Sequence, residues 1–303
     1  MNQLRTLIAL AQCNSFSLAA EKLFLTQPAV SFQINSLEEH FGARLVDRSG
    51  RRIELTEEGR QVLAFAKEAL AALARTEYAV NELTRRVRGP LLVGASTIPG
   101  EYILPHIIGA FIAKYPDVQI SLEIGDSEQI TRKILDQCLD IGVVGAVTNK
   151  QQLLSDIVLE DELVLIVPGR HRWPSGISVT VQDLKEEDFI FREKGSGTRQ
   201  VFTERLKERG LDANELNIVM ELGSPEAILT AVEAGLGISV VSRWAADKAL
   251  ALGQVRGINI AGVSLKRNLF VIRHRQTLPN RALEEFQSFL SSIRINTLTQ
   301  IVS

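Results

Sequence analysis

The chain has 303 residues, of which 45% are hydrophobic and 23% are charged, and its formal net charge at pH 7 is -2. This length predicts two or three domains, and the composition is that of a globular protein with a sizeable core. The overall charge does not indicate nucleic-acid binding, so any such charge must be local. We find no signal-peptide pattern and no run of about 18 apolar residues, and therefore expect a cytoplasmic protein with no membrane partner.

Catalytic and metal chemistry find little support in the residues that would carry them. Cys13 and Cys138 lie far apart, so we expect no structural disulfide and interpret both as small buried residues. The histidines do not share metal-ligand spacing with cysteine, and no Ser-His-Asp arrangement is indicated. We therefore predict no catalytic residue, no metal site, no cofactor and no enzymatic activity. The four histidines are His40, His106, His171 and His274.

The first sixty residues are rich in helix signals. Apolar residues at helical spacing predict a first helix that ends near Cys13. Ser17 is the predicted N-cap of a second helix over 18–24, because serine accepts a hydrogen bond from the first-turn N–H groups. Thr26 is the predicted N-cap of a third helix, which has a proline in its first turn and ends at Gly42.

Two short extended runs, 45–46 and 53–55, flank an arginine-rich segment and predict a β-hairpin. A long helix is then expected from Thr56 to about Arg88. Its apolar stripe follows steps of four and three, the heptad spacing of two helices that pack side by side, so we expect a dimer. Packing of the stripe on its own chain is the alternative. The stripe consists of Val62, Ala66, Ala69, Leu73, Thr76, Val80 and Leu83.

After a predicted hinge at 88–90, apolar strands alternate with helices, which indicates an α/β fold with parallel sheet. The predicted strands are 91–95, 118–124, 141–144, 163–167, 189–191, 218–221, 238–241 and 265–272, and helices begin at Pro99, Ser127, Gly197, Pro225 and Arg281. We expect two of these strands, 163–167 and 265–272, to form the hinge between two halves that close on a ligand.

The predicted organisation is thus multi-domain. It comprises a winged helix-turn-helix domain at 1–58, a linker and dimerisation helix at 59–89, and an effector-binding domain at 90–303, with sub-domain I at about 90–162 and 265–303 and sub-domain II at about 163–264.

Helix, tight turn, helix and arginine-rich hairpin is the order of a winged helix-turn-helix, which places its second helix in the DNA major groove. The start of that helix suits base reading, because glutamine pairs with adenine, hydroxyls pair with either partner, and proline touches a thymine methyl. Arginines in the hairpin suit backbone or minor-groove contact, with a solvated basic turn as the alternative. The candidate DNA-binding residues are Ser17, Thr26, Gln27, Pro28, Ser31, Gln33, Arg48, Arg51 and Arg52.

Four segments of this region strongly resemble the LysR-type transcriptional regulators: 16–23 (FSLAAEKL), 26–34 (TQPAVSFQI), 37–39 (LEE) and 55–59 (LTEEG). The resemblance extends over the whole chain and implies a winged helix-turn-helix, a linker helix and two α/β halves like those of periplasmic solute-binding proteins. It implies DNA contacts by the recognition-helix and wing residues named above. Phe32 departs from the pattern, since relatives often have a basic or polar residue there, and an apolar contact is expected instead.

Open α/β sheets bind ligands where strand ends meet helix N-termini. Four stretches place hydroxyls and small residues there, namely 95–98, 125–128, 194–199 and 222–226. Each alone is more often a helix cap, but their convergence predicts binding of a carboxylate, sulfate or phosphate. The resemblance implies that several of them line an effector cleft between the halves. The candidate effector-binding residues are Ser96, Thr97, Ser127, Val147, Ser196, Thr198, Ser224 and Pro225, with Thr148 beside Val147 at the rim.

The sequence therefore predicts a regulator that binds double-stranded DNA at an interrupted inverted repeat and responds to a small effector, an anion or carboxylate, bound between two sub-domains. We expect a homodimer through the linker helix; the resemblance implies a homotetramer, and RNA polymerase is a further candidate partner. The alternative is a cytoplasmic small-molecule-binding protein or enzyme on the same scaffold, with an N-terminal region that serves only dimerisation. The Thr-Gln-Pro helix start and arginine hairpin favour the regulator.

Overall fold

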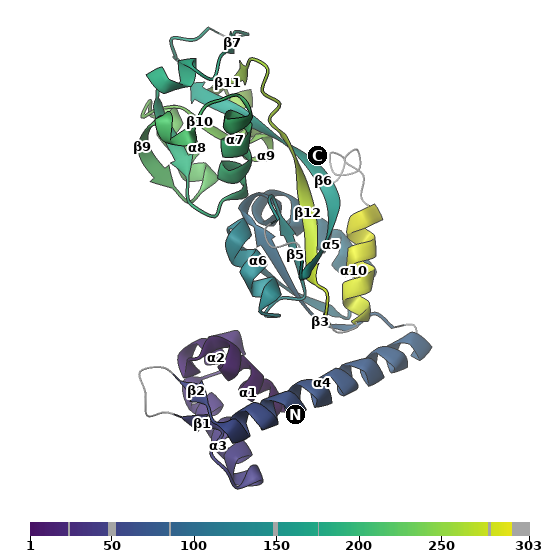
Figure 1. The fold of residues 1–303 in the computed structure, drawn as a ribbon. Helices are drawn as coiled ribbons and strands as arrows, with labels where there is room; N and C mark the ends of the chain where they lie inside the picture. Colours follow the sequence, from purple (N-terminus) through teal and green to yellow (C-terminus); the bar gives the residue numbers. More distant parts are fainter. Residues whose placement is uncertain are drawn as a thin grey trace. The chain divides into compact units, whose positions relative to one another are not determined.

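The computed structural model describes residues 1–23, 25–47, 53–84, 86–147, 151–174, 176–277 and 280–292. They form two compact units, the first built mainly from Met1–Arg86 and the second mainly from Val87–Thr277 with a C-terminal helix (Figure 1). None of the helices in these ranges combines the length and the apolar character that a membrane crossing requires.

The first unit packs three short helices, a two-stranded hairpin and the start of a long helix around one apolar core. Leu7, Ile34 and Leu37 are buried in that core. The hairpin strands pair antiparallel with Val46 opposite Leu55, which confirms the predicted hairpin. The elements are α1 (Asn2–Cys13), α2 (Phe16–Lys22), α3 (Gln27–Phe41), β1 (Val46–Asp47), β2 (Glu54–Leu55) and α4 (Glu57–Thr84).

Local capping sets the helix boundaries of this unit, and it corrects one prediction. Ser15 is the N-cap of α2, because its backbone is extended at φ -155° and its hydroxyl accepts from Leu18 N–H at 3.4 Å. Ser17 was the wrong choice, since it lies inside the helix with an exposed side chain. Thr26 has the extended backbone of an N-cap before α3, and Gly42 ends that helix in the left-handed region at φ 63°.

Helix α4 ends at Thr84 rather than near Arg88, and the first strand of the second unit begins at Gly89. Its stripe divides into two parts. Val62 and Ala66 are buried on the side where α4 packs against α1, so the alternative of packing on its own chain holds there. Beyond Ala66 the described members of the stripe are half-buried or exposed, and the Leu83 side chain lies outside what the structure describes.

The second unit is built from ten strands and the helices that cover them, within the described ranges. The strands are β3 (Gly89–Ser96), β4 (Val118–Gly125), β5 (Ile141–Val144), β6 (Leu153–Pro168), β7 (Ser178–Val179), β8 (Asp188–Arg192), β9 (Asn217–Leu222), β10 (Ser239–Ser242), β11 (Val255–Ile260) and β12 (Lys266–His274). The helices are η1 (Pro99–Ile103), α5 (Leu104–Lys114), α6 (Ser127–Leu135), η2 (Asp183–Glu186), α7 (Gly197–Glu208), η3 (Ala213–Glu215), α8 (Pro225–Glu233), α9 (Arg243–Ala251) and α10 (Arg281–Ser292).

The main sheet is mixed, which corrects the expectation of parallel sheet. Its order is β4-β3-β5-β12-β6-β11-β7, with β10 also paired to β6, and β8 and β9 form a separate parallel pair. β3 runs parallel to β4 and β5, as expected for strands joined through helices. β12 pairs antiparallel with β6, because the chain leaves the first half of the unit along β6 and returns to it along β12.

Strand β6 belongs to both halves (Figure 1). Its residues 153–162 pair with β12, whereas 163–168 pair with β10 and β11. At the crossing, Leu163 N–H donates to the Leu265 carbonyl at 2.9 Å. The first half carries β3–β5, α5, α6 and α10, and the second carries β7–β11 and α7–α9.

Each half has its own apolar core. In the first half, Phe286 of α10 meets Phe111 of α5 edge to face, with ring centroids 5.0 Å apart, so the C-terminal helix packs on the first half. In the second half, Phe189 of β8 stacks on Phe202 of α7 at 5.6 Å. Two cores joined by two strands leave a boundary between the halves where polar residues gather.

Candidate functional site

The start of α3 presents polar groups to solvent. Thr26, Gln27 and Pro28 are exposed and Ser31 is half-buried. The N–H groups of a first helical turn attract phosphate, and an exposed glutamine can donate to and accept from adenine. This end of α3 therefore has the chemistry of a DNA-reading surface, as the sequence predicts.

Two further side chains of α3 differ in their surroundings. The Gln33 carbonyl accepts from the buried Thr6 hydroxyl at 2.5 Å, so this candidate DNA contact also ties α3 to α1. Phe32 is 74% exposed, which leaves its ring available for an apolar contact. The predicted wing residues Arg48, Arg51 and Arg52 lie outside the described residues.

A narrow polar hollow lies at the boundary between the two halves of the second unit. A volume of only about 10 Å³ inside it is open to water-sized molecules, which is room for about one water. Five of the predicted effector residues line it: Ser96, Thr97, Ser127, Ser196 and Thr198. The remaining lining residues are Ile98, Asp126, Arg192, Gly197 and Arg267.

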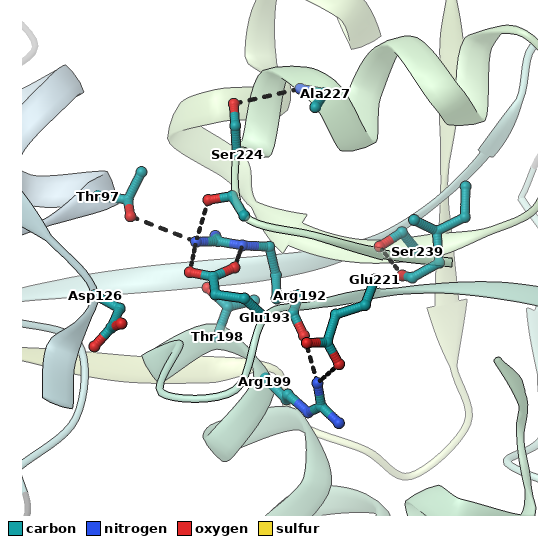
Figure 2. Close-up of polar contacts among 12 residues, drawn as sticks. Thr97, Asp126, Arg192, Glu193, Thr198, Arg199, Glu221, Ser224, Ala227 and Ser239 are labelled. Carbon is teal, nitrogen blue, oxygen red and sulfur yellow. Dashed lines mark hydrogen bonds and ion pairs between the residues drawn. The ribbon is translucent and has the colours of Figure 1, made fainter. Parts of the chain in front are cut away.

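Arg192, the last residue of β8, reaches across this hollow (Figure 2). Its Nε donates to Glu193 Oε2 at 2.7 Å and its Nη2 donates to Oε1 at 2.8 Å, which makes a bidentate pair. Nη2 also lies 3.4 Å from Thr97 Oγ1 in the first half and 3.4 Å from the Gly223 carbonyl in the second. Since 4% of the Arg192 side chain is exposed, a buried cation bridges the two halves.

Arg267 of β12 is a second buried guanidinium. Its Nε and Nη2 each lie 2.7 Å from Asp161 Oδ2, and its Nη1 donates to Thr198 Oγ1 at 3.1 Å. Asp161 also accepts from the Ser242 hydroxyl at 2.7 Å, so its carboxylate is held from two sides. Burial lowers the pKa of Arg267, Asp161 opposes that effect, and the positive charge of Arg192 lowers it further. Two cations therefore share one water-poor site.

Ser127, the first residue of α6, has a buried hydroxyl with no hydrogen-bond partner among the described residues. Gly197, the first residue of α7, approaches it so closely that a Cβ there would lie 2.8 Å from Ser127 Oγ. Helices α6 and α7 thus begin at the same hollow, where their N-terminal N–H groups favour negative charge. An unpartnered buried hydroxyl costs free energy that a ligand accepting its proton would offset.

Three of the predicted effector residues lie elsewhere. Val147 lines a different, more open hollow beside β12, and its neighbour Thr148 is outside the described residues. Ser224 caps α8, where its hydroxyl accepts from Ala227 N–H at 3.4 Å (Figure 2), and Pro225 is buried in the first turn of that helix. These positions follow a strand end as predicted, but they do not line the hollow that holds the two arginines.

Both arginines escaped the sequence-based prediction. Arg192 follows the apolar run of β8. A charged residue at the end of a buried strand was the one feature of the sequence that could have indicated a binding role. Arg267 meets Asp161 across 106 residues of chain, and no local pattern marks that pairing. Within the described ranges, no three His, Cys, Asp or Glu side chains are placed to hold a metal ion.

The fold and the two sites define a helix-turn-helix protein that carries an α/β unit for binding small molecules. Two family models together cover most of the chain. The bacterial regulatory helix-turn-helix protein model of the lysR family matches residues 1–60, and the LysR substrate binding domain model matches residues 84–293. The chain therefore belongs to the LysR family of transcriptional regulators, which confirms the resemblance and the fold class drawn from the sequence.

Relatives of known sequence and structure agree with this assignment. A probable RuBisCO transcriptional regulator of Cyanidioschyzon merolae is 38% identical over 284 residues, 93% of this chain and 92% of the relative. The regulatory domain of CcmR from Synechocystis PCC6803, solved in complex with 2-PG, is 28% identical with a TM-score of 0.63 and covers 69% of this chain and 99% of that domain. Full-length CbnR in complex with its target DNA is similar in fold. It is 23% identical with a TM-score of 0.57, and the match covers 95% of this chain and 98% of CbnR.

Proposed function

We propose that this regulator senses a small oxyanion, a carboxylate or phosphate, bound in the hollow between the two halves of its second unit. The observation that carries the proposal is the convergence of two buried guanidiniums and an unpartnered hydroxyl on that hollow. Guanidinium forks match the geometry of carboxylate and phosphate oxygens, and they bind them strongly where water is excluded. The similar regulatory domain of CcmR is solved in complex with 2-PG, which supports a small-molecule site in this unit.

Three contributions would combine on such an anion. Arg192 supplies a cation from the second half, and Ser127 supplies a hydroxyl from the first half. The N-termini of α6 and α7 add aligned N–H groups, with Ser96, Thr97, Ser196 and Thr198 as neighbours. Because these groups come from both halves, the anion would bind one spacing of the halves better than another, and that difference is what shifts a conformational equilibrium.

Replacing Arg192 with glutamine tests the site. Wild-type protein is expected to gain thermal stability with inorganic phosphate, sulfate or succinate, because a ligand that binds the folded state stabilises it. Arg192→Gln should weaken that binding on the order of tenfold or more, the effect of losing charge-assisted hydrogen bonds. The unfolding midpoint is read from tryptophan fluorescence, since both tryptophans, Trp173 and Trp244, lie in the second unit.

Arg205→Gln is the matched control, since Arg205 lies in the same half but pairs with Glu208 outside the hollow. Its binding curves should follow those of the wild type. Equal stabilisation of wild type and Arg192→Gln by every anion would place the effector somewhere else.

We further infer that α3 reads the major groove with Thr26, Gln27, Pro28 and Ser31, and that a dimer presents two copies of it to an interrupted inverted repeat. The stripe of α4 beyond Ala66 is the proposed seam, since the earlier part is covered within the unit. A tetramer built from two such dimers is part of the proposal. So is the division into residues 1–58, 59–89 and 90–303, with sub-domain II at about 163–264.

Gln27→Ala tests the recognition surface. An amide that pairs with adenine contributes about 1–3 kcal/mol of base discrimination, so specific affinity should fall roughly 5- to 150-fold. Binding is measured by fluorescence anisotropy with DNA upstream of the protein's own gene, against non-specific competitor at several salt concentrations. Gln61→Ala, an exposed glutamine of α4, is the matched control and should bind like the wild type. Unchanged specific affinity in Gln27→Ala would remove this residue from the interface.

A further inference from the structure

We propose that Glu193 is an internal competitor for the effector: its carboxylate occupies the Arg192 guanidinium in the resting protein and must be displaced by the incoming oxyanion. This inference rests on the proposed function of the hollow and adds a residue that sets how tightly and how selectively the hollow binds.

The hollow as it stands is nearly filled by its own side chains. The volume open inside it, about 10 Å³, would hold about one water, and a carboxylate or phosphate is larger than one water. The Arg192 side chain is part of what fills it, and 4% of that side chain is exposed. A ligand must therefore rearrange the contacts of Arg192 in order to enter.

Glu193 holds Arg192 in the way that an effector would. Its two oxygens accept from Nε and Nη2 at 2.7 and 2.8 Å, the fork geometry in which a guanidinium binds a free carboxylate (Figure 2). Among the described residues, Arg192 alone donates to this carboxylate. The two remaining contacts of Nη2, to Thr97 and the Gly223 carbonyl, are longer at 3.4 Å.

The second arginine of the hollow, Arg267, has a carboxylate partner that is held more firmly than Glu193. Asp161 is fully buried beside Arg267 and also accepts from Ser242, so releasing it would leave buried charges uncompensated. Glu193 is the first residue of the loop between β8 and α7, and its side chain is 24% exposed. Its carboxylate can therefore turn toward water when it leaves Arg192. Exchange at Arg192 costs little, because one bidentate acceptor replaces another and the released one is hydrated.

The charge balance makes this exchange necessary. Each guanidinium already has its own carboxylate, Glu193 for Arg192 and Asp161 for Arg267, and Asp126, which caps α6, also lines the hollow, so the resting site holds no surplus positive charge. Glu101 of η1 and Glu226 of α8 add to the acidic surroundings: burial and the Glu226 carboxylate raise the pKa of Glu101, and Arg192 lowers it. An added anion becomes favourable once Glu193 gives up its guanidinium.

Displacement also defines the chemical class of the ligand. A carboxylate, phosphate or sulfate replaces both acceptor oxygens of Glu193, whereas chloride offers a single point of contact and leaves one N–H group unpaired. The hollow should therefore select bidentate oxyanions over halides, and Glu193 should raise the concentration at which they act.

The test compares Glu193→Gln with wild type in the full chain, titrated with sodium phosphate at constant pH and ionic strength and followed by tryptophan-detected thermal unfolding. Removing the competing charge should lower the half-saturating phosphate concentration on the order of tenfold or more. Potassium chloride in place of phosphate should produce no saturable stabilisation in either protein. The matched control is Glu208→Gln, which removes the same charge from a carboxylate paired with Arg205 outside the hollow, and its titration should stay within about twofold of wild type.

The outcomes separate the two proposals. If Glu193→Gln binds phosphate no tighter than wild type while Arg192→Gln loses binding, the hollow takes the anion but Glu193 does not compete. If phosphate gives no saturable stabilisation of either wild type or Glu193→Gln, the hollow does not bind the anion. In that case both the proposed site and the competitor role of Glu193 are ruled out. If Glu193→Gln and Glu208→Gln tighten binding equally, general electrostatics explains the effect and the proposal is wrong.

Discussion

Replacing Asp161 with alanine is expected to lower the free energy of unfolding of the second unit by about 3–5 kcal/mol. The substitution removes the carboxylate that pairs with Arg267 through Nε and Nη2, and it also takes the acceptor from Ser242. Arg267 would remain buried with its charge uncompensated, close to the positive charge of Arg192. Urea unfolding followed by tryptophan fluorescence measures the loss, because both tryptophans lie in this unit.

The preceding residue provides a matched control. Glu160 pairs with Lys266 at 2.9 Å on the same two strands, but these side chains are 50% and 65% exposed. Glu160→Ala should therefore change stability by less than about 1 kcal/mol. A double substitution, Asp161→Leu with Arg267→Leu, should recover much of the lost stability, since it removes both charges together. A loss below 1 kcal/mol in Asp161→Ala would mean that Arg267 finds water or another acceptor.

Replacing Gly59 with alanine is expected to detach the start of α4 from the helix-turn-helix domain and to abolish specific DNA binding. A Cβ at this position would lie 2.0 Å from the Leu45 carbonyl oxygen and 3.0 Å from its carbon. That carbonyl also accepts from Thr56 N–H at 3.1 Å, so the hairpin and the helix meet at this point. Both of these atoms belong to the backbone and cannot move aside as a flexible side chain can. We therefore expect a loss of stability at the upper end of the usual 1–3 kcal/mol for overpacking, roughly 3 kcal/mol.

Hydrogen–deuterium exchange over residues 1–60 and DNA anisotropy would measure this effect in the full chain. Faster exchange there should accompany the loss of binding, while the tryptophan-detected unfolding of the second unit stays unchanged. Gly109→Ala is the control, because this glycine lies in α5 and a Cβ added there would have no atom within 4 Å. Alanine at this position should stabilise the helix by up to about 1 kcal/mol. Normal DNA binding by Gly59→Ala would show that the contact with Leu45 can relax.

The closeness of Gly59 to Leu45 illustrates what local sequence conveys. The segment from Thr56 to Gly59 predicts a helix start from its cap and acids, and that helix begins there. It contains no sign of which backbone group the glycine must accommodate. The prediction of Ser17 as a cap failed for a related reason, since Ser15 suits the role equally well by residue type and the path of the turn after α1 decides between the two serines.

What the sequence by itself determined is the DNA-reading module and the family. Its signals are contiguous: a helix start at Thr26, a proline in the first turn, Gly42 at the end, and apolar positions one helical turn apart. Each depends on interactions within a few residues, so the order of amino acids specifies them almost completely. The same holds for the serine and threonine residues of 96–97 and 196–198, which mark strand ends and helix starts.

Only the tertiary structure decided which charges meet in the hollow. Arg192 comes from β8, Arg267 from β12 and Ser127 from α6, and their distances depend on how β6 and β12 cross between the halves. Strand pairing over such separations is set by the packing of two whole cores, which no short segment encodes. The sequence therefore identifies a transcriptional regulator with an effector-binding domain, whereas the fold determines that Arg192 and its neighbour Glu193 meet at the hollow that we propose as the effector site.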